Sequence, residues 1–163
     1  MSVRNDFDSV SQEETIVKKE VSSVSNTGNT ASGESFQGKP TVLVVDDDKK
    51  ILEAFKYLME SENCNMIGAC DVDEVMKKIQ DVHLDLIITD FMLESKSSIE
   101  LFTLIRKSQP EVPVVVMTGY PELISEKDVK MFGGNYLLTK PLELGRLRNV
   151  IRSCVNPLKI ASY

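Results

Sequence analysis

The sequence predicts an α/β fold built on a parallel sheet of five strands. Two observations support this prediction. From Pro40 onward, short apolar runs alternate with helical patterns of about ten to fifteen residues, which is typical of repeated βα units around a parallel sheet. Three of the apolar runs offer apolar side chains to both faces, as strands in the centre of such a sheet do.

Each expected strand is one of these apolar runs. The strands are expected at residues 41–45 (TVLVV), 65–69 (NMIGA), 84–89 (LDLIIT), 112–117 (VPVVVM) and 135–138 (NYLL). The first, third and fourth are the central candidates, because both of their faces are apolar.

Helix-end signals separate the expected strands. Residues 71–74 (DVDE) and 97–100 (SSIE) have capping-box spacing, in which side chains satisfy the free N–H groups of a helix start. Gln109-Pro110 ends the third helix and Gly133-Gly134 the fourth, because proline disfavours a helical predecessor and glycine tolerates a left-handed cap. The last helix is expected from about residue 142 to 154.

The expected domain organisation has three parts. Residues 1–39 are expected to form a disordered, serine-rich leader, because they offer too few apolar side chains to offset the entropy lost on ordering. A short apolar patch at residues 16–24 leaves a partner-binding helix open, although an unstructured leader is the favoured interpretation. The folded domain is expected at 40–155 and a tail at 156–163.

Composition argues against several classes of function. The formal net charge is −6 and no basic block could follow a phosphate backbone, so direct nucleic-acid binding is not expected. No apolar run has the length of a signal peptide or a membrane span, so a cytoplasmic protein without membrane insertion is expected. The three cysteines lack C-x-x-C spacing and are expected to be reduced core residues.

Polar side chains directly follow four of the expected strands. Asp46 and Asp47 follow the first strand, Asp90 the third, Thr118 the fourth and Lys140 the fifth. Because the carboxyl ends of parallel strands meet at one edge, where open α/β sheets bind ligands, these side chains are expected to converge.

The chemistry of these groups suggests phosphoryl transfer. Clustered carboxylates raise each other's pKa unless a positive charge lies among them, and they suit Mg²⁺, which commonly shares its protein ligands with a phosphoryl group. Asp90 is expected to be the exposed nucleophile at the centre of the cluster, forming an acyl phosphate. Lys140 and the Thr118 hydroxyl would hold phosphoryl oxygens, and Gly119 leaves room for the incoming group. Asp48 is interpreted as a helix N-cap.

These motifs together resemble a known family. The runs VVDD (44–47), ITD (88–90), VVVMTG (114–119) and TKP (139–141) are similar to those of the receiver domain of two-component response regulators, over residues 41 to about 154. The resemblance implies a flavodoxin-like, doubly wound sheet with strand order 2-1-3-4-5 and helices on both faces. It also implies a phosphoacceptor signalling protein rather than an enzyme, phosphorylated by a sensor histidine kinase or a histidine phosphotransfer protein.

The resemblance implies a Mg²⁺ site as well. By motif position, its ligands would be Asp46, Asp47, Asp90 and the backbone carbonyl of Met92.

The other roles follow in the same way. Asp90 would be the phosphoacceptor, Thr118 the switch hydroxyl and Lys140 the lysine that contacts the phosphoryl group, and the peptide bond before Pro141 is expected to be cis. The surface that changes on phosphorylation, and that meets a downstream protein, is expected near residues 121–154.

The chain departs from the family pattern at two places. Leu93, Glu94 and Ser98 stand where receivers usually carry a Met-Pro pair and a glycine. The switch aromatic is replaced by Leu137, while Tyr136 falls one residue early and therefore points to the other face of its strand. The usual coupling between threonine and aromatic ring is not expected here.

Two bulky side chains occupy positions that modulate the access of water in this family. Met92 lies two residues beyond Asp90, and Tyr120 two beyond Thr118. Our hypothesis is that both shield the acyl phosphate and slow its hydrolysis.

The expected function is that of a stand-alone receiver that signals through a partner protein or passes phosphate along a phosphorelay, and the sequence does not distinguish these two outputs. One alternative is a pseudo-receiver, an interaction module that works without phosphorylation. A more remote alternative is a Mg²⁺-dependent phosphohydrolase, in which Asp46 and Asp48 would form a D-x-D pair of nucleophile and general acid.

Overall fold

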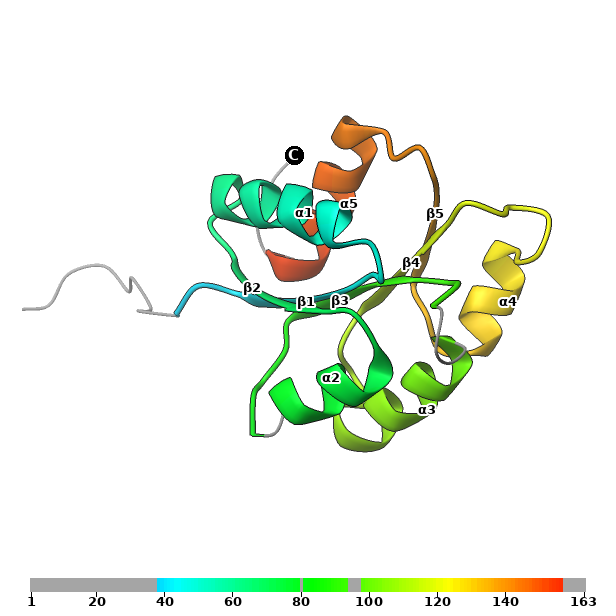
Figure 1. Cartoon of the computed structure of the whole chain (residues 1–163), viewed down its shortest axis with the longest axis horizontal. Coiled ribbons are helices and arrows are strands. Elements are labelled where there is room, and N and C mark those ends of the chain that lie inside the picture. The colour runs from blue at the N-terminus through cyan, green and yellow to red at the C-terminus, as the bar shows by residue number, and fades with distance from the viewer. Residues whose placement is uncertain (1–37, 80, 94–97, 157–163) are drawn as a thin grey trace, which may run out of the picture. The chain divides into compact units, whose positions relative to one another are not determined.

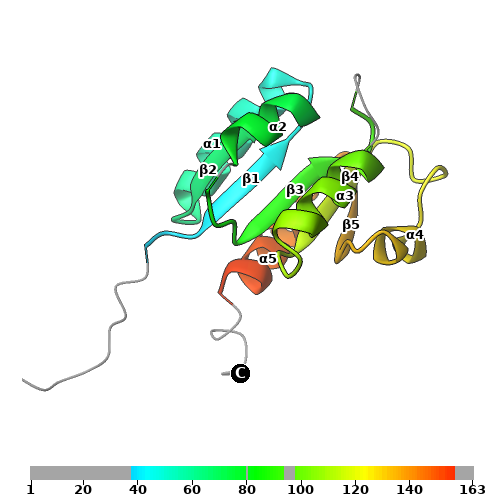
Figure 2. The same ribbon diagram turned by 90° about the horizontal axis from the view of Figure 1, so that it is seen from below.

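The strands form a single parallel sheet. The computed structural model of the chain describes residues 38–79, 81–93 and 98–156. The strand order is β2-β1-β3-β4-β5, which confirms the predicted topology and is visible in Figure 2. The strands are β1 (Thr41–Val45), β2 (Asn65–Ala69), β3 (Leu86–Asp90), β4 (Val114–Thr118) and β5 (Tyr136–Thr139).

Helices cover both faces of the sheet, as predicted. They are α1 (Lys49–Ser61), α2 (Val72–Lys78), α3 (Ser98–Ser108), α4 (Glu126–Met131) and α5 (Leu144–Val155). In Figure 1, α1 and α5 lie above the sheet, α2 and α3 lie below it, and α4 lies beside β5.

The sheet separates two apolar clusters, because successive side chains of a strand point to opposite faces. We call the cluster against α2, α3 and α4 the lower core; its members include Leu43, Ile87, Ile105, Val116 and Val129. We call the cluster against α1 and α5 the upper core; its members include Val44, Leu58, Ile88, Met117 and Ile151. The central strands β1, β3 and β4 are almost entirely buried, as expected from their two apolar faces.

Strands β3, β4 and β5 begin one or two residues later than expected and each ends one residue later. The late starts have local causes: Pro113 has no N–H to donate to a ladder, and the N–H of Leu84 donates to the side chain of Gln109. The strands end later than expected because their pairing is made by backbone groups and continues through polar residues. These residues are Asp90, Thr118 and Thr139.

The predicted helix starts are correct in part. Asp71 caps α2 by accepting a hydrogen bond from the N–H of Glu74 at 2.7 Å. The Glu74 carboxylate, however, accepts from the N–H of Cys70 instead of that of Asp71, so the reciprocal bond of a capping box is displaced by one residue. Asp48 caps α1 through the N–H of Lys50, as expected.

The helix ends also follow the expected signals. Gly133, after α4, has a φ of 87°, a left-handed conformation that glycine adopts without strain. Helix α5 starts two residues later than expected, because the Glu143 side chain accepts from the N–H groups of Gly145 and Arg146 and so fixes the cap. The expected cap at Ser97, Glu94, most of the expected leader and most of the tail lie outside the described residues.

Candidate functional site

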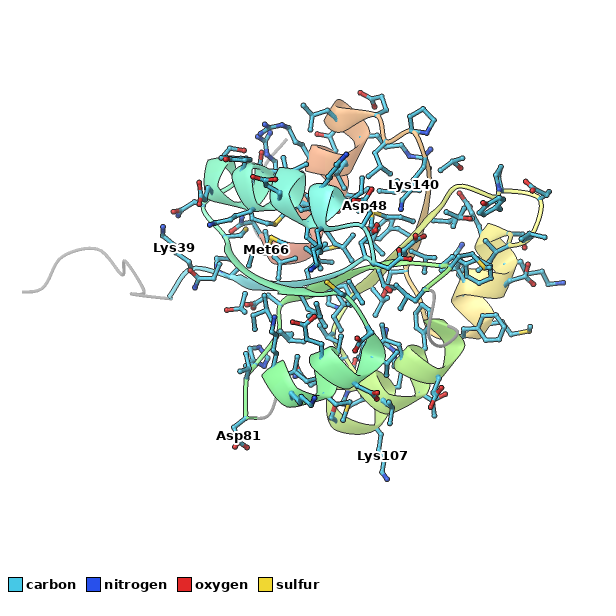
Figure 3. The ribbon with its side chains drawn as sticks, viewed as in Figure 1. Lys39, Asp48, Met66, Asp81, Lys107 and Lys140 are labelled. Atoms are coloured by element: carbon cyan, nitrogen blue, oxygen red, sulfur yellow. The ribbon has the colours of Figure 1, made fainter. Side chains whose placement is uncertain are left out.

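The carboxyl ends of the strands bring an ammonium group to two carboxylates. Lys140, which follows β5, donates from Nζ to Asp46 Oδ2 at 2.8 Å and to Asp90 Oδ2 at 3.0 Å. In Figure 3, Lys140 is labelled well to the right of Lys39, which precedes β1. The sequence placed these groups at one edge of the sheet, and the structure brings them into direct contact.

Asp46 is held from both sides. Its side chain is 1% exposed, Oδ2 accepts from Lys140, and Oδ1 accepts from the backbone N–H of Asp48 at 3.0 Å. The sequence pattern predicted a helix cap at Asp48 but did not indicate that its backbone N–H would also bind Asp46. The sequence does indicate a tight turn here, because only three residues separate the end of β1 from the start of α1.

The charges of the cluster depend on one another. Burial raises the pKa of Asp46 above its ordinary value, against the hydrogen bonds from Lys140 and Asp48. Burial also disfavours the charged form of Lys140, but the hydrogen bonds to Asp46 and Asp90 outweigh it and raise the pKa of the lysine. Lys140 therefore stays protonated and neutralises part of the carboxylate charge.

Asp46, Asp47 and Asp90 can serve together as metal ligands. One carboxylate oxygen from each lies within 4.8 Å of the others. Hard oxygen donors with a net negative charge are the donor set that Mg²⁺ prefers, so the residues present fit this ion.

Asp90 is more buried than the sequence suggested. Its side chain is 12% exposed, because Lys140 lies over one carboxylate oxygen and the backbone of Phe91 is tied to β4 by its N–H donating to Met117 O at 2.7 Å. The remaining exposed surface leaves an approach to the carboxylate from the edge of the sheet.

Thr118 and Gly119 lie at the end of β4. The Thr118 side chain is fully buried, its hydroxyl oxygen accepts from the N–H of Tyr120 at 2.9 Å, and its carbonyl accepts from the N–H of Lys140 at 2.7 Å. At Gly119, a Cβ atom would meet nothing within 4 Å, which agrees with the open space expected there.

The remaining residues singled out in the sequence differ in exposure and in the face of the sheet on which they lie. Met92 is 50% exposed and Tyr120 is 54% exposed. Leu137 packs against the lower core, whereas Leu138 belongs to the upper core, so the neighbouring Tyr136 lies on the face away from Leu137. The Lys140–Pro141 peptide bond is cis, the isomer that the resemblance implied.

The fold and the site define a class of protein. It is a doubly wound α/β domain whose carboxylates meet an ammonium group where parallel strands end, the place where such sheets bind ligands. The family model of the response regulator receiver domain matches residues 42–152, and the chain therefore belongs to this family. Its members are signalling domains that accept a phosphoryl group, and response regulators receive it from histidine kinases.

Relatives and solved structures agree with this assignment. Response regulator protein PilR of Pseudomonas aeruginosa is 29% identical over 113 residues, which cover 69% of this chain and 25% of PilR. Protein PilG of the same organism is 27% identical over 116 residues, 70% of this chain and 86% of PilG. The receiver domain of the Francisella response regulator 1452 is 28% identical with a TM-score of 0.64, covering 73% of this chain and 98% of that domain.

The share of each relative that the match covers differs from one relative to the next. The chain spans a quarter of PilR and half of the alkaline phosphatase synthesis regulator PhoP of Bacillus subtilis. Among the described residues, no helix combines the length and the apolar character that crossing a membrane requires.

Proposed function

We propose that the chain accepts a phosphoryl group on Asp90 in a Mg²⁺-dependent reaction and signals through a protein partner or a phosphorelay. The observation that carries this proposal is the contact of one ammonium group, Lys140 Nζ, with both Asp46 and Asp90. It places a fixed positive charge beside the carboxylate that would attack phosphorus.

The reaction requires no other covalent partner from the protein. One Asp90 carboxylate oxygen forms a bond to phosphorus while the bond from phosphorus to an imidazole nitrogen of the donor breaks, and that nitrogen keeps the electron pair. Lys140 stabilises the negative charge of the transferred group, and the open space at Gly119 accommodates it. Attack by water on phosphorus later returns the carboxylate and inorganic phosphate.

Asp46, Asp47, Asp90 and the backbone carbonyl of Met92 would hold Mg²⁺. When bound, the ion supplies positive charge that offsets the charge of the phosphoryl oxygens. The protein's contribution is to hold three carboxylates within reach of each other, which Lys140 and the Asp48 amide do by fixing Asp46.

The phosphoryl donor would be a sensor histidine kinase or a histidine phosphotransfer protein in the cytoplasm. The downstream protein would meet residues near 121–154, which include α4, β5 and α5. On this proposal the chain catalyses only its own phosphorylation and dephosphorylation. The phosphohydrolase alternative lacks support, because the Asp48 carboxylate accepts the N–H of Lys50 as a helix cap.

The test is the intact mass of the protein after incubation with Mg²⁺ and acetyl phosphate. We expect the gain of one phosphoryl group, its loss in Asp90→Asn, and its prevention by a chelator. Asp81→Asn is the matched control, because Asp81 is an exposed aspartate away from the cluster. Retention of the phosphoryl group in Asp90→Asn would contradict the assignment of the acceptor, and no gain in the wild type would favour the pseudo-receiver.

A further inference from the structure

A buried hydroxyl lies between two valines in the middle of the sheet. Thr89 is 1% exposed, and its partners on the neighbouring strands are Val45 of β1 and Val116 of β4, which are both fully buried in the lower core. A valine at this position would have nearly the same shape and would bury no polar group. Because a buried hydroxyl is costly unless it forms a hydrogen bond, the group that it bonds indicates what the threonine contributes.

The Thr89 hydroxyl bonds the backbone of the proposed phosphoacceptor. Its Oγ1 donates to the carbonyl oxygen of Asp90 at 3.0 Å. The ladder between β1 and β3 ends at the pair Val45 and Thr89, and the N–H of Asp46 donates to Ala69 of β2. The hydroxyl therefore supplies a donor to the Asp90 carbonyl at the point where the backbone pairing of β3 with β1 stops.

The peptide group between Asp90 and Phe91 is consequently held at both ends. Its carbonyl accepts from Thr89, and its N–H, which belongs to Phe91, donates to Met117 O at 2.7 Å. A planar peptide group with both ends bonded cannot rotate without breaking one of the two bonds. The Cα atom of Asp90 is part of the same plane, so fixing the plane restricts the direction in which the Asp90 side chain leaves the strand.

The Thr89 hydroxyl lies on the other face of the sheet from the Asp90 carboxylate. Ile87 belongs to the lower core and Ile88 to the upper core, so by the alternation of β3 Thr89 points to the lower face and Asp90 to the upper face. The Asp90 carboxylate contacts Lys140 Nζ at 3.0 Å, away from the threonine. Any effect of the hydroxyl on the reaction must therefore pass through the backbone that it holds.

We propose that Thr89 is a positioning residue for phosphorylation, because its hydroxyl fixes the peptide group after Asp90 and so holds the carboxylate in the direction from which it attacks phosphorus. The inference rests on the proposed function. Without the hydroxyl, the Asp90 carbonyl has to find another donor, and the carboxylate spends less time in the attacking geometry. Since small displacements of a reacting group lower a rate strongly, we expect the loss of this bond to slow phosphorylation roughly 3- to 10-fold.

Two substitutions separate the hydroxyl from the volume of the side chain. Thr89→Val keeps the shape and removes the hydroxyl, and it should be phosphorylated roughly 3- to 10-fold more slowly than the wild type. Thr89→Ser keeps the hydroxyl and removes a methyl group from the lower core, so it should melt at a lower temperature but react within about twofold of the wild-type rate. Ile87→Val is the matched control, because it removes a methyl group from the same face of the same strand and should also melt lower at an unchanged rate.

Two measurements test the proposal in the full chain. The rate constant of phosphorylation by acetyl phosphate and Mg²⁺ is followed by intact mass, well below the melting temperature of each variant. Hydrogen exchange of the Phe91 amide, measured by NMR without a phosphoryl donor, reports the peptide group itself. We expect this amide to exchange roughly 3- to 10-fold faster in Thr89→Val than in the wild type. The Ile87 amide, which donates to Pro113 O near the start of β3, is the internal control and keeps its rate.

The outcomes separate the inference from the function beneath it. A wild-type chain that gains no phosphoryl group overturns both. If the wild type is phosphorylated, an equal rate in Thr89→Val, or an unchanged exchange rate of its Phe91 amide, overturns the inference and leaves the proposed function standing. Rates that fall with the melting temperature in Thr89→Ser and Ile87→Val would also overturn it, because packing alone would then explain the effect. Should Thr89→Val fail to fold, Thr89→Ser and Thr89→Ala, which differ in the hydroxyl, give the same comparison.

Discussion

Lys140 supplies a single positive charge to the cluster of Asp46, Asp47 and Asp90. Its ammonium contacts Asp46 and Asp90, two of the three residues whose oxygens could hold Mg²⁺. The lysine and the cation therefore compete for the same negative charge, in addition to any cooperation around a phosphoryl group.

The Lys140→Met variant is expected to bind Mg²⁺ at least about threefold more tightly than the wild type, because the carboxylates lose their internal counter-charge. The measurement is the rise in melting temperature with Mg²⁺ concentration, from which the Kd follows. Lys130→Met, which removes an exposed lysine of α4, is the control and should bind as the wild type does. Equal or weaker binding in Lys140→Met would contradict the competition.

A substitution at Met92 tests the hypothesis that this side chain shields the acyl phosphate from water. The side chain is half exposed beside the strand end that carries Asp90, so it can limit the approach of water without contributing to the core. Met92→Asn is expected to accelerate phosphate loss by several-fold. The decay of phosphorylated protein is followed by intact mass after removal of the donor, and an unchanged decay rate would argue against shielding.

At the residue scale, the sequence predicted side-chain chemistry better than backbone contacts. Asp46, Asp90 and Lys140 could be found because each comes within two residues of the end of an expected strand. The Asp48 N–H that holds Asp46, and the Tyr120 N–H that holds Thr118, could not be found, because every residue except proline carries an N–H and only the turn geometry selects one.

At the element scale, a buried carboxylate joins the C-terminal end of α1 to α5. Glu62, 5% exposed in its side chain, accepts hydrogen bonds from Arg148 and from Arg152 Nε, the latter at 2.7 Å. Arg152 is more than half exposed and its bond is weakened by solvent, whereas Arg148 is better shielded. The bonds from Arg152, against the cost of burial, hold the pKa of Glu62 below its ordinary value.

Glu62→Gln is expected to lower the free energy of unfolding by about 1–2 kcal/mol at neutral pH, because the three hydrogen bonds from Arg148 and Arg152 lose their ionised acceptor. Chemical denaturation measures the difference, with Glu60→Gln, an exposed residue of the same helix, as the control.

Wild type and Glu62→Gln also test how the free energy of unfolding depends on pH. A carboxyl group whose folded pKa is depressed stabilises the fold above its unfolded pKa, and this contribution is lost as pH falls through the folded pKa. The difference in free energy of unfolding between wild type and Glu62→Gln should therefore be constant near neutral pH and shrink below about pH 4.5. A difference that grows on acidification would contradict the assigned direction.

Strands and helices were predictable where a short stretch of sequence is enough to mark them. The runs that form β1 and β2 coincide with the observed strands, Thr41–Val45 and Asn65–Ala69. The contact between α3 and the end of α4 was not predictable. Arg106 of α3 donates from its guanidinium to the carbonyl of Gly133, which is 27 residues away in the sequence and adjacent only in the fold.

At the scale of the whole molecule, the first of the described residues, just before β1, already contact the rest of the fold. The Lys39 carbonyl accepts from the Asn65 side chain and the Pro40 carbonyl from the Asn65 N–H at 2.8 Å, while the Thr41 N–H donates to Asp85 at 2.7 Å. The expected domain start at residue 40 stays a prediction, which shortened chains can test.

A chain that starts at residue 38 is expected to melt within about 2 °C of the full chain and to accept phosphate equally well. A chain that starts at residue 42 loses the contacts of residues 39–41 and is expected to melt several degrees lower. Differential scanning calorimetry of the three chains checks both statements. A large loss of stability in the chain that starts at residue 38 would show that the preceding residues stabilise the domain.

The topology of the whole molecule followed from the sequence because alternating βα patterning and right-handed crossovers leave few arrangements. Periodicity alone did not determine the order of the strands; the strand-end motifs did, through their resemblance to receiver domains. The family match over residues 42–152 and the observed order β2-β1-β3-β4-β5 confirm that assignment.

The separation of the two cores by the sheet has a consequence for how the chain tolerates change. Because the upper and the lower core are distinct clusters of buried side chains, substitutions in one should leave the packing of the other intact. Ile151→Val and Ile105→Val should each cost about 0.5–1.5 kcal/mol, and the double variant should equal their sum within about 0.5 kcal/mol. Side chains in the two cores can then be varied independently. A clear departure from additivity would show that the sheet transmits strain between the two cores.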